Sequence, residues 1–95
     1  MDKKINYRKE ARDRECQIRV PTLCNWDSAT TVLAHLPNGS MGLKTDDRLG
    51  AWGCSTCHDA VDGRIRTEYT KEALNLMHHE GVIRTQRVLI REGKM

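Results

Sequence analysis

Four cysteines in two local pairs constrain this 95-residue chain more than any other feature of its sequence. The first pair is Cys16 and Cys24, with seven residues between them, and the second is Cys54 and Cys57, with two. Cys-x2-Cys pairs are common in structural zinc sites, which take four ligands in a tetrahedron. A small chain with only 38% apolar residues buries a thin core, so a metal would help it to fold. The cysteines therefore predict one structural Zn²⁺.

Two disulfide bonds or a covalently bound haem are the alternatives for these cysteines. Residues 54–58 read C-S-T-C-H, which matches a c-type haem attachment site. Haem attachment belongs to exported proteins, and the basic N-terminus has no apolar run behind it that would form a signal peptide. We therefore expect a cytoplasmic protein without haem. A reducing cytosol favours a metal site over disulfides, but a disulfide-stapled partner protein stays open as an interpretation.

The distribution of apolar and turn residues predicts one small α+β domain over residues 1–95. A short basic helix over 6–13 and a knuckle around the first cysteine pair make up residues 6–28. Residues rich in β-branching predict a strand over 29–36, and a loop with several turn residues leads to a second strand over 49–53. A helix over 55–63 completes a β-β-α core at about 29–66. One or two helices are expected over 70–92, and no apolar stretch is long enough to span a membrane.

Individual residues mark the ends and the inner face of these helices. Ser55 or Thr56 can cap the helix over 55–63, Gly63 can end it, and Thr70 can cap the helix that follows. Whether Gly81 breaks the C-terminal segment is left open. Apolar residues in that segment recur at roughly helical spacing and predict a core-facing stripe of Leu74, Met77, Val82, Val88 and Leu89.

The chain is mildly basic, with a formal net charge of +3. Its basic residues crowd the first fifth of the sequence and follow the second cysteine pair. A solvated face and a surface for nucleic acid both account for this distribution. The candidates for phosphate contacts are Arg8, Lys9, Arg12, Arg64 and Arg66.

His58 directly follows Cys57 and has to be explained separately. In a helix it is rotated by about 100° from Cys57, so the two side chains are not expected to share an ion. Asp62 lies four residues on, on the same face as His58. Such a pair can bind a divalent ion or form an ordinary surface hydrogen bond. If the strands fold back on this helix, His35 faces the pair and can act as a general base.

The sequence resembles the HNH (ββα-metal) nucleases, in which a histidine ends one strand and Cys-x2-Cys-His opens a helix after the second. More specifically, E-C-Q-I-R-V-P, V-L-A-H-L, C-S-T-C-H-D and the late R-T-Q resemble the small YbcO-like nucleases of lambdoid phages and prophages. The resemblance covers about residues 8–92. It implies a small zinc-stabilised ββα-metal domain of treble-clef type with flanking helices.

The resemblance also implies a role for each matching residue. His35 matches the first histidine of the pattern, the general base that activates water. His58 matches the last histidine, a ligand of the catalytic divalent ion (Mg²⁺, Mn²⁺, Ni²⁺ or Zn²⁺), and Asp62 falls where some members carry a second ligand. The cysteines match the structural zinc site of the cysteine-bearing branch, which consists of Cys16, Cys24, Cys54 and Cys57.

Two positions depart from the pattern of that family. Ala34 stands where Asp or His commonly binds the metal. The middle Asn, which orients the base, has no clean match. Asp46 or Asp47 is the nearest candidate for orienting His35 or completing the metal shell, and Asn38 is a poorer one.

Together these features predict a metal-dependent DNA endonuclease of phage or prophage type that acts in DNA recombination or processing. The expected location is the cytoplasm of a bacterial host, as a homodimer or beside phage recombination proteins. The alternative is a noncatalytic zinc module that binds nucleic acid or a protein partner. That module keeps the cysteines and the basic face but needs neither His35 nor Asp62.

Overall fold

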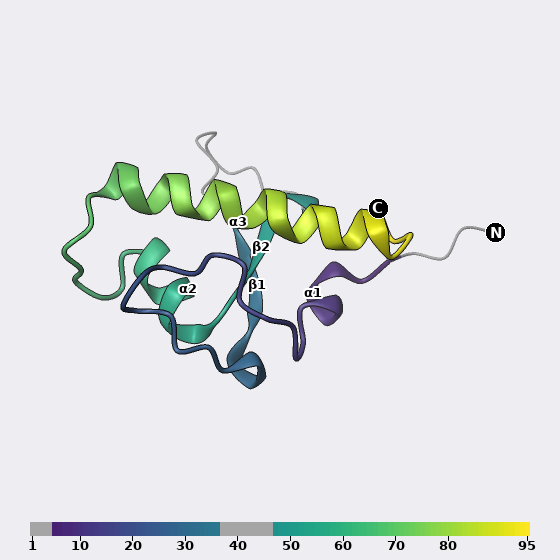
Figure 1. Cartoon of the computed structure of the whole chain (residues 1–95), viewed down its shortest axis with the longest axis horizontal. Helices are drawn as coiled ribbons and strands as arrows, with labels where there is room; N and C mark the ends of the chain where they lie inside the picture. Colours follow the sequence, from purple (N-terminus) through teal and green to yellow (C-terminus); the bar gives the residue numbers. More distant parts are fainter. Residues whose placement is uncertain (1–4, 37–46) are drawn as a thin grey trace.

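The computed structural model describes residues 5–36 and 47–95, which form a small α+β domain (Figure 1). Two strands followed by a helix stand at the centre of the chain, in the order that the sequence predicts. The elements are α1 (Tyr7–Glu10), a 3₁₀ turn (Ser28–Thr30), β1 (Val32–His35), a second 3₁₀ turn (Asp47–Leu49), β2 (Gly50–Gly53), α2 (Ser55–Val61) and α3 (Lys71–Arg91).

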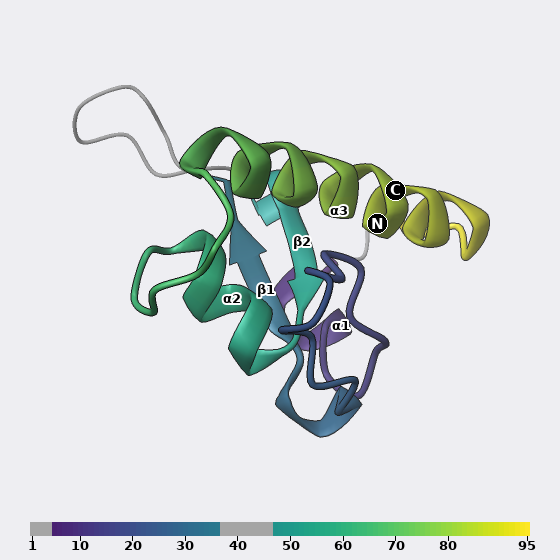
Figure 2. The same cartoon turned by 60° about the vertical axis from the view of Figure 1, so that its left-hand side comes forward.

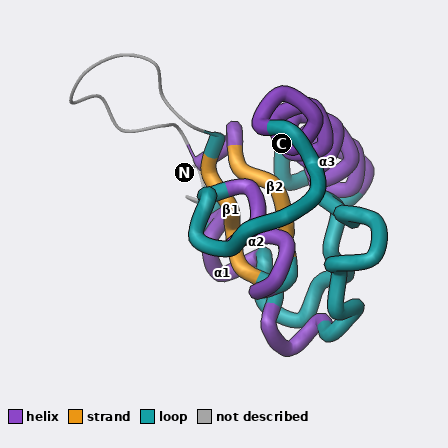
Figure 3. The backbone as a smooth tube through the Cα atoms, turned by 90° about the vertical axis from the view of Figure 1, so that its left-hand side faces the viewer, coloured by secondary structure: helices purple, strands orange, loops and turns teal. Residues whose placement is uncertain are grey.

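β1 and β2 form a two-stranded antiparallel sheet in which Leu33 pairs with Trp52 and Ala34 pairs with Ala51. Successive side chains of a strand point to opposite faces, so the large pair and the alanine pair lie on different faces. Each pair is the centre of its own cluster of buried residues. The long α3 lies to one side of the sheet, next to β2, and contributes to both clusters (Figure 2 and Figure 3).

α3 is a single helix of 21 residues that continues through Gly81. The Thr70 hydroxyl caps it, as the sequence predicts, by accepting a hydrogen bond from the Ala73 N–H. A Cβ atom at position 81 would lie 3.1 Å from the Cα of Ile18 and 3.2 Å from the Cβ of Ala51. Gly81 therefore lets the helix approach the sheet closely and does not break it.

The buried face of α3 is more polar than its predicted apolar stripe. Met77 and Val88 are only partly buried. The Thr85 hydroxyl accepts a hydrogen bond from the Trp52 N–H at 3.0 Å, and the Gln17 N–H donates to the Trp52 carbonyl at 2.6 Å. Thr85 on this face and Gln17 in the preceding knuckle thus bind both backbone groups of Trp52 in the sheet. The buried residues of α3 are Leu74, His78, Gly81, Val82, Thr85 and Leu89.

Residues 13–26 form the predicted knuckle, a run of turns without helix or strand between α1 and the sheet. Asp13, Arg19, Thr22 and Trp26 have φ between 55° and 67°, in the left-handed region that non-glycine residues seldom adopt. Such strained positions persist only where the surrounding structure holds them. The turns are therefore expected to depend on what binds the knuckle to α2.

A cluster of charged residues, here called the terminal clamp, joins α1 to the C-terminal end of α3. Arg14 lies 2.6 Å from a Glu92 oxygen and 3.1 Å from Glu10, and Lys94 contacts both carboxylates. The hydrogen bonds from Arg14 and Lys94 lower the pKa of Glu92 to about 2. The Arg14 guanidinium also lies 4.6 Å from the ring centroid of Trp52 in β2, so the terminal clamp contacts the sheet.

Several element boundaries differ from the predicted ones. α1 is one short turn and does not reach residue 13, and each strand spans four residues, because irregular turns occupy the flanking segments. α2 ends at Val61, and Gly63 follows with φ of 77°, as expected for a residue that stops a helix. Cys54 caps α2 in place of Ser55 or Thr56, since its sulfur accepts the Cys57 N–H. No helix in the described residues has the length and apolar character needed to cross a bilayer.

Candidate metal centre and candidate active site

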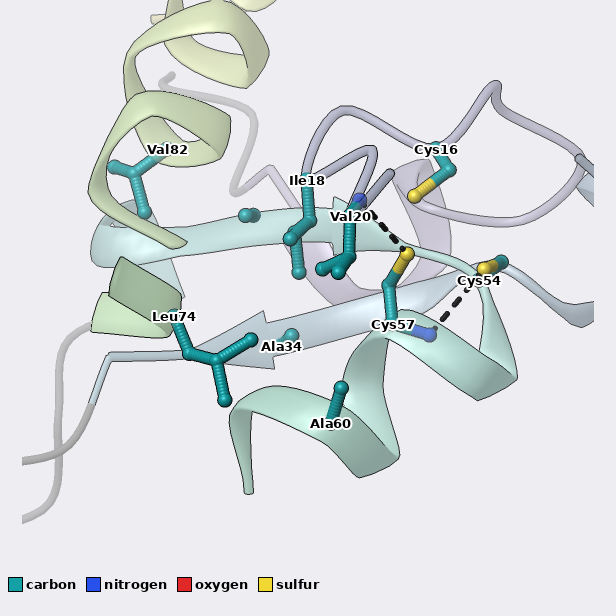
Figure 4. Packing of buried hydrophobic residues seen from close by; sticks show 10 residues of the cluster. Cys16, Ile18, Val20, Ala34, Cys54, Cys57, Ala60, Leu74 and Val82 are labelled. Atoms are coloured by element: carbon teal, nitrogen blue, oxygen red, sulfur yellow. Dashed lines mark hydrogen bonds between the residues drawn. The ribbon is translucent and has the colours of Figure 1, made fainter. Parts of the chain in front are cut away.

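Four cysteine sulfur atoms converge where the knuckle meets the start of α2, and Figure 4 draws those of Cys16, Cys54 and Cys57. These atoms, from Cys16, Cys24, Cys54 and Cys57, lie within 4.8 Å of one another. The sulfurs of Cys24 and Cys54 are 3.9 Å apart. A tetrahedral Zn²⁺ with Zn–S bonds of about 2.3 Å requires sulfurs about 3.8 Å apart, whereas a disulfide requires about 2.05 Å. All four cysteines are free, and their geometry fits a metal.

Backbone N–H groups also point at these sulfurs. The Arg19 N–H donates to Cys16, the Val20 N–H to Cys57 and the Cys57 N–H to Cys54, each with a nitrogen–sulfur distance of 3.4 Å. Two of these contacts are drawn in Figure 4. Donors aimed at sulfur stabilise a thiolate, which is the form that binds metals. The residue with left-handed backbone at position 19 thus supplies one of the N–H groups that contact the cysteine sulfurs.

The acidities of the thiols differ because the four groups are so close. A hydrogen bond from Cys57 lowers the pKa of Cys16 to about 4, and the same contact raises the pKa of Cys57. Burial raises the pKa of Cys24 to about 11. One thiolate is thus favoured and the further ones are opposed, unless a cation balances their charge. This donor set fits Zn²⁺, which would release protons on binding.

A second candidate site lies in a cleft on the other side of α2. His35, the last residue of β1, and His58, in α2, both line this cleft of about 400 Å³. Their side chains are 28% and 26% exposed, so solvent reaches both. Arg8 and Arg12 contribute positive charge. The remaining lining residues are Thr31, Val32 and Leu33.

His35 is held by a carboxylate. Its Nε2 lies 2.6 Å from Oδ1 of Asp47, which opens the 3₁₀ turn before β2. The Arg8 Nε lies 3.5 Å from the same oxygen. The hydrogen bond from His35 is the main reason why the pKa of Asp47 is lowered. Of the two aspartates that the sequence offers, Asp47 therefore reaches His35, while Asp46, like Asn38, lies outside the described residues.

His58 forms the predicted pair with Asp62 one helical turn further on. The distance from His58 Nε2 to Asp62 Oδ2 is 3.1 Å. Two ligands at right angles on an ion with bonds of about 2.1 Å lie about 3.0 Å apart, so this spacing suits a shared ion as well as a hydrogen bond. Within the described ranges, only the cysteines form a cluster of three or more potential ligands. Among the described residues, an ion at His58 and Asp62 would thus have these two protein ligands, and water or substrate can supply others.

The residues predicted to bind phosphate differ in their distance from the cleft and in their contacts. Arg8 and Arg12 line the cleft, and Lys9 is exposed on α1. Arg64 lies 3.4 Å from Asp62 and 3.6 Å from Asp59. The last candidate, Arg66, is exposed after α2. The basic residues of the N-terminal segment are therefore the ones that flank the two histidines.

His78 is a buried residue near the cleft that sequence reasoning missed. It lies on α3, is 1% exposed, and its Nε2 is 2.8 Å from the carbonyl oxygen of Ala34. Because a carbonyl only accepts, Nε2 carries the hydrogen. Burial lowers the pKa of His78, which keeps the ring neutral. Its spacing of four residues from Leu74, on the buried face, was the signal that could have revealed it.

The fold and the two candidate sites define a small α+β domain that pairs a cluster of four cysteines, whose geometry fits a metal, with a histidine cleft. Residues 5–94 match the family described as "Putative nuclease YbcO". Curated proteins of that name from Escherichia coli (strain K12) and Enterobacteria phage 82 are each 40% identical over 94 residues, covering 93% of this chain and 94% of theirs. A solved structure titled as a putative bacteriophage protein from E. coli K-12 has a TM-score of 0.81 and 38% identity, and the match covers 93% of this chain and all of that one.

The chain belongs to the YbcO family. The match extends over nearly the full length of the relatives, so it includes the knuckle, the sheet and α3 together.

Proposed function

We propose that this chain is a metal-dependent DNA endonuclease of the HNH (ββα-metal) type. The observation that carries the proposal is that His35 at the end of β1 and His58 in α2 line one cleft, each beside its own carboxylate. The names of the relatives, which call them nucleases, support the same class.

His35 would act as the general base. The Asp47 carboxylate accepts a hydrogen bond from Nε2, which leaves Nδ1 as the proton acceptor of a neutral ring. Nδ1 would take a proton from a water molecule as the water oxygen attacks the phosphorus atom. The bond from phosphorus to the 3′ oxygen then breaks. Asp47 would take the place of the family's orienting Asn, since it fixes the tautomer and the ring orientation of His35.

His58 and Asp62 would hold the catalytic divalent ion. Such an ion supplies Lewis-acid stabilisation of the charge that develops on the phosphate and on the leaving oxygen. Mg²⁺ is usually bound by one or two protein ligands and keeps several waters, so two ligands suffice and Ala34 need not contribute one. Arg64, now 3.4 Å from Asp62, would be freed for a phosphate contact when Asp62 binds the ion.

Arg8 and Arg12 would bind the backbone of DNA on either side of the cleft. Contacts with phosphates position a protein without reading sequence, and their strength falls as salt rises. The cysteine centre would hold one structural Zn²⁺. Because Cys54 and Cys57 open the helix that carries His58, this Zn²⁺ would fix the second histidine relative to the sheet.

Nicking of supercoiled plasmid tests the proposal. The wild-type protein should nick DNA with at least one of Mg²⁺, Mn²⁺ and Ni²⁺, and His35→Ala should lower the rate by about 100-fold or more, the usual contribution of a general base. His79→Ala is the matched control, since His79 is exposed on α3 and should leave the rate unchanged. Equal cleavage by wild type and His35→Ala would remove the role of His35. DNA binding without cleavage under any metal would favour the noncatalytic zinc module.

A further inference from the structure

The outer face of α3 carries a line of exposed aliphatic side chains. Leu76, Ile83 and Ile90 are 62%, 55% and 59% exposed. They are spaced by seven residues, which is close to two helical turns, so they lie along one line on the helix. This line faces away from the residues of α3 that pack on the sheet. Packing among the described residues does not explain it.

Exposed large hydrophobic side chains are more concentrated on this line than on the rest of the described surface. Eight large hydrophobic side chains are exposed in the described residues, and three of them lie here. Single exposed apolar residues need no explanation, but several aliphatic residues aligned on one helix face indicate a contact. Aliphatic residues repeated every seventh residue fill one of the two core positions of the heptad by which helices pack along one another.

We propose that α3 binds α3 of a second copy of this chain in antiparallel orientation, with Ile83 on the two-fold axis. In this register Ile83 packs on its own counterpart, and Leu76 of each copy packs on Ile90 of the other. The same surface is then used twice, as in most homodimers. Leu76 and Ile90 each lie seven residues from Ile83, so the line is symmetric about Ile83. The second copy therefore covers all three aliphatic side chains.

The charges that flank the line fit this orientation. Glu80 and Arg87 are both exposed and lie on the same side of the line, at about 60° and about 40° from Ile83 around the helix. Antiparallel pairing centred on Ile83 places Glu80 of one copy within one residue of Arg87 of the other. Two opposite-charge contacts result, one on each side of the axis. Such flanking charges set the orientation and register of paired helices.

The geometry also predicts a moderate affinity and a free cleft. α3 is about 31 Å long at 1.5 Å per residue, and one line of three aliphatic side chains is small compared with stable interfaces of about 1,200–2,000 Å². We therefore expect association in the micromolar range. The outer side of α3 faces away from β1 and α2 (Figure 2), so the cleft stays accessible in both copies. The proposal does not depend on nuclease activity.

Sedimentation equilibrium of the metal-loaded full chain tests the dimer. Wild type should pass from monomer to dimer between about 1 and about 100 μM, and Ile83→Lys, which places two like charges on the axis, should weaken association by at least tenfold. Ile65→Lys is the matched control, because Ile65 is an exposed aliphatic residue that precedes α3 and is not part of this line. It should leave association unchanged. A wild-type protein that stays monomeric throughout, or equal effects of both substitutions, would overturn the proposal.

Charge reversal tests the register. Glu80→Arg should weaken the dimer, because it brings the new Arg beside Arg87 of the other copy, and the double variant Glu80→Arg with Arg87→Glu should restore it. Both positions are exposed, so circular dichroism should show unchanged folding. A dimer that Glu80→Arg does not weaken, or that the double variant does not restore, would contradict the antiparallel arrangement.

Discussion

The side chains on the two faces of α2 are held by different kinds of interaction. Cys57, on one face, is fully buried among sulfurs and backbone N–H groups. His58, the next residue, lies in a solvated cleft and is held by one carboxylate at 3.1 Å. The cysteine centre is fixed by the backbone, whereas the cleft is fixed by exchangeable charged contacts. A short helix can thus separate the residues that hold the fold from those that would perform chemistry, and changes on the two faces should have different consequences.

Cys57→Ser should give the largest effect, because it replaces a buried thiolate ligand of the metal with a hydroxyl, which binds Zn²⁺ poorly. Structural Zn²⁺ contributes folding free energy of about 10–16 kcal/mol in small zinc domains. We expect loss of bound metal, loss of cooperative unfolding and loss of any cleavage. Elemental analysis and thermal unfolding followed by circular dichroism measure the first two. A variant that still unfolds cooperatively with no metal would show that the centre is dispensable.

His58→Ala should affect the cleft alone. The metal of the cysteine centre and the unfolding temperature should stay close to those of the wild type, because the side chain is part of neither buried cluster. Plasmid nicking should fall by about 100-fold, equivalent to about 2.7 kcal/mol of transition-state stabilisation. If the zinc content fell in parallel with activity, the proposed independence of the two faces would be wrong.

Gly81→Ala should lower the stability of the fold moderately. The helix α3 contacts the knuckle at Ile18 and the sheet at Ala51, so the change affects the supports of both the cysteine centre and the cleft. Alanine raises helix propensity by about 1 kcal/mol, but forcing a methyl group into a packed interface costs about 1–3 kcal/mol. We expect a net loss of about 1 kcal/mol in the free energy of unfolding, measured with denaturant. An increase in stability would mean that α3 does not approach the sheet so closely.

Glu92→Gln should have the smallest effect and spare both faces, since the terminal clamp lies at the other end of α3. Arg14 and Lys94 lower the pKa of Glu92 from 4.5 to about 2, so its stabilising contacts are fully present above pH 4.5. They are lost as the pH falls toward 2. The difference in unfolding free energy between wild type and variant should therefore shrink over this range. A difference that stays constant with pH would argue against the ion pairs.

The sequence predicts the parts of the fold that depend on local signals. Gly63 and Thr70 mark helix ends through their own backbone and side-chain chemistry, and the first cysteine pair predicts the knuckle. Gly81 could not be interpreted alone, because its role depends on Ile18, 63 residues earlier, and on the sheet. Polar Thr85 escaped the apolar pattern because its partner is the Trp52 N–H.

In the candidate sites, too, some contacts follow from local sequence signals and others depend on how distant parts of the chain meet. The convergence of the four cysteines follows from the predicted zinc pattern, and the His58–Asp62 contact follows from helical spacing. That Asp47 contacts His35 depends on how the chain returns into β2, which residue types do not specify. The catalytic and metal-binding roles themselves stay predictions for the experiments above.

The hydrogen bonds at Trp52 have a consequence for how this chain meets others. Both backbone groups of Trp52 on the outer edge of β2 are occupied, by the Thr85 hydroxyl and the Gln17 N–H. An exposed strand edge is a template for uncontrolled addition of foreign strands. Here that edge is closed by a helix side chain and a turn, so a sheet of only two strands is protected from extension and aggregation along β2.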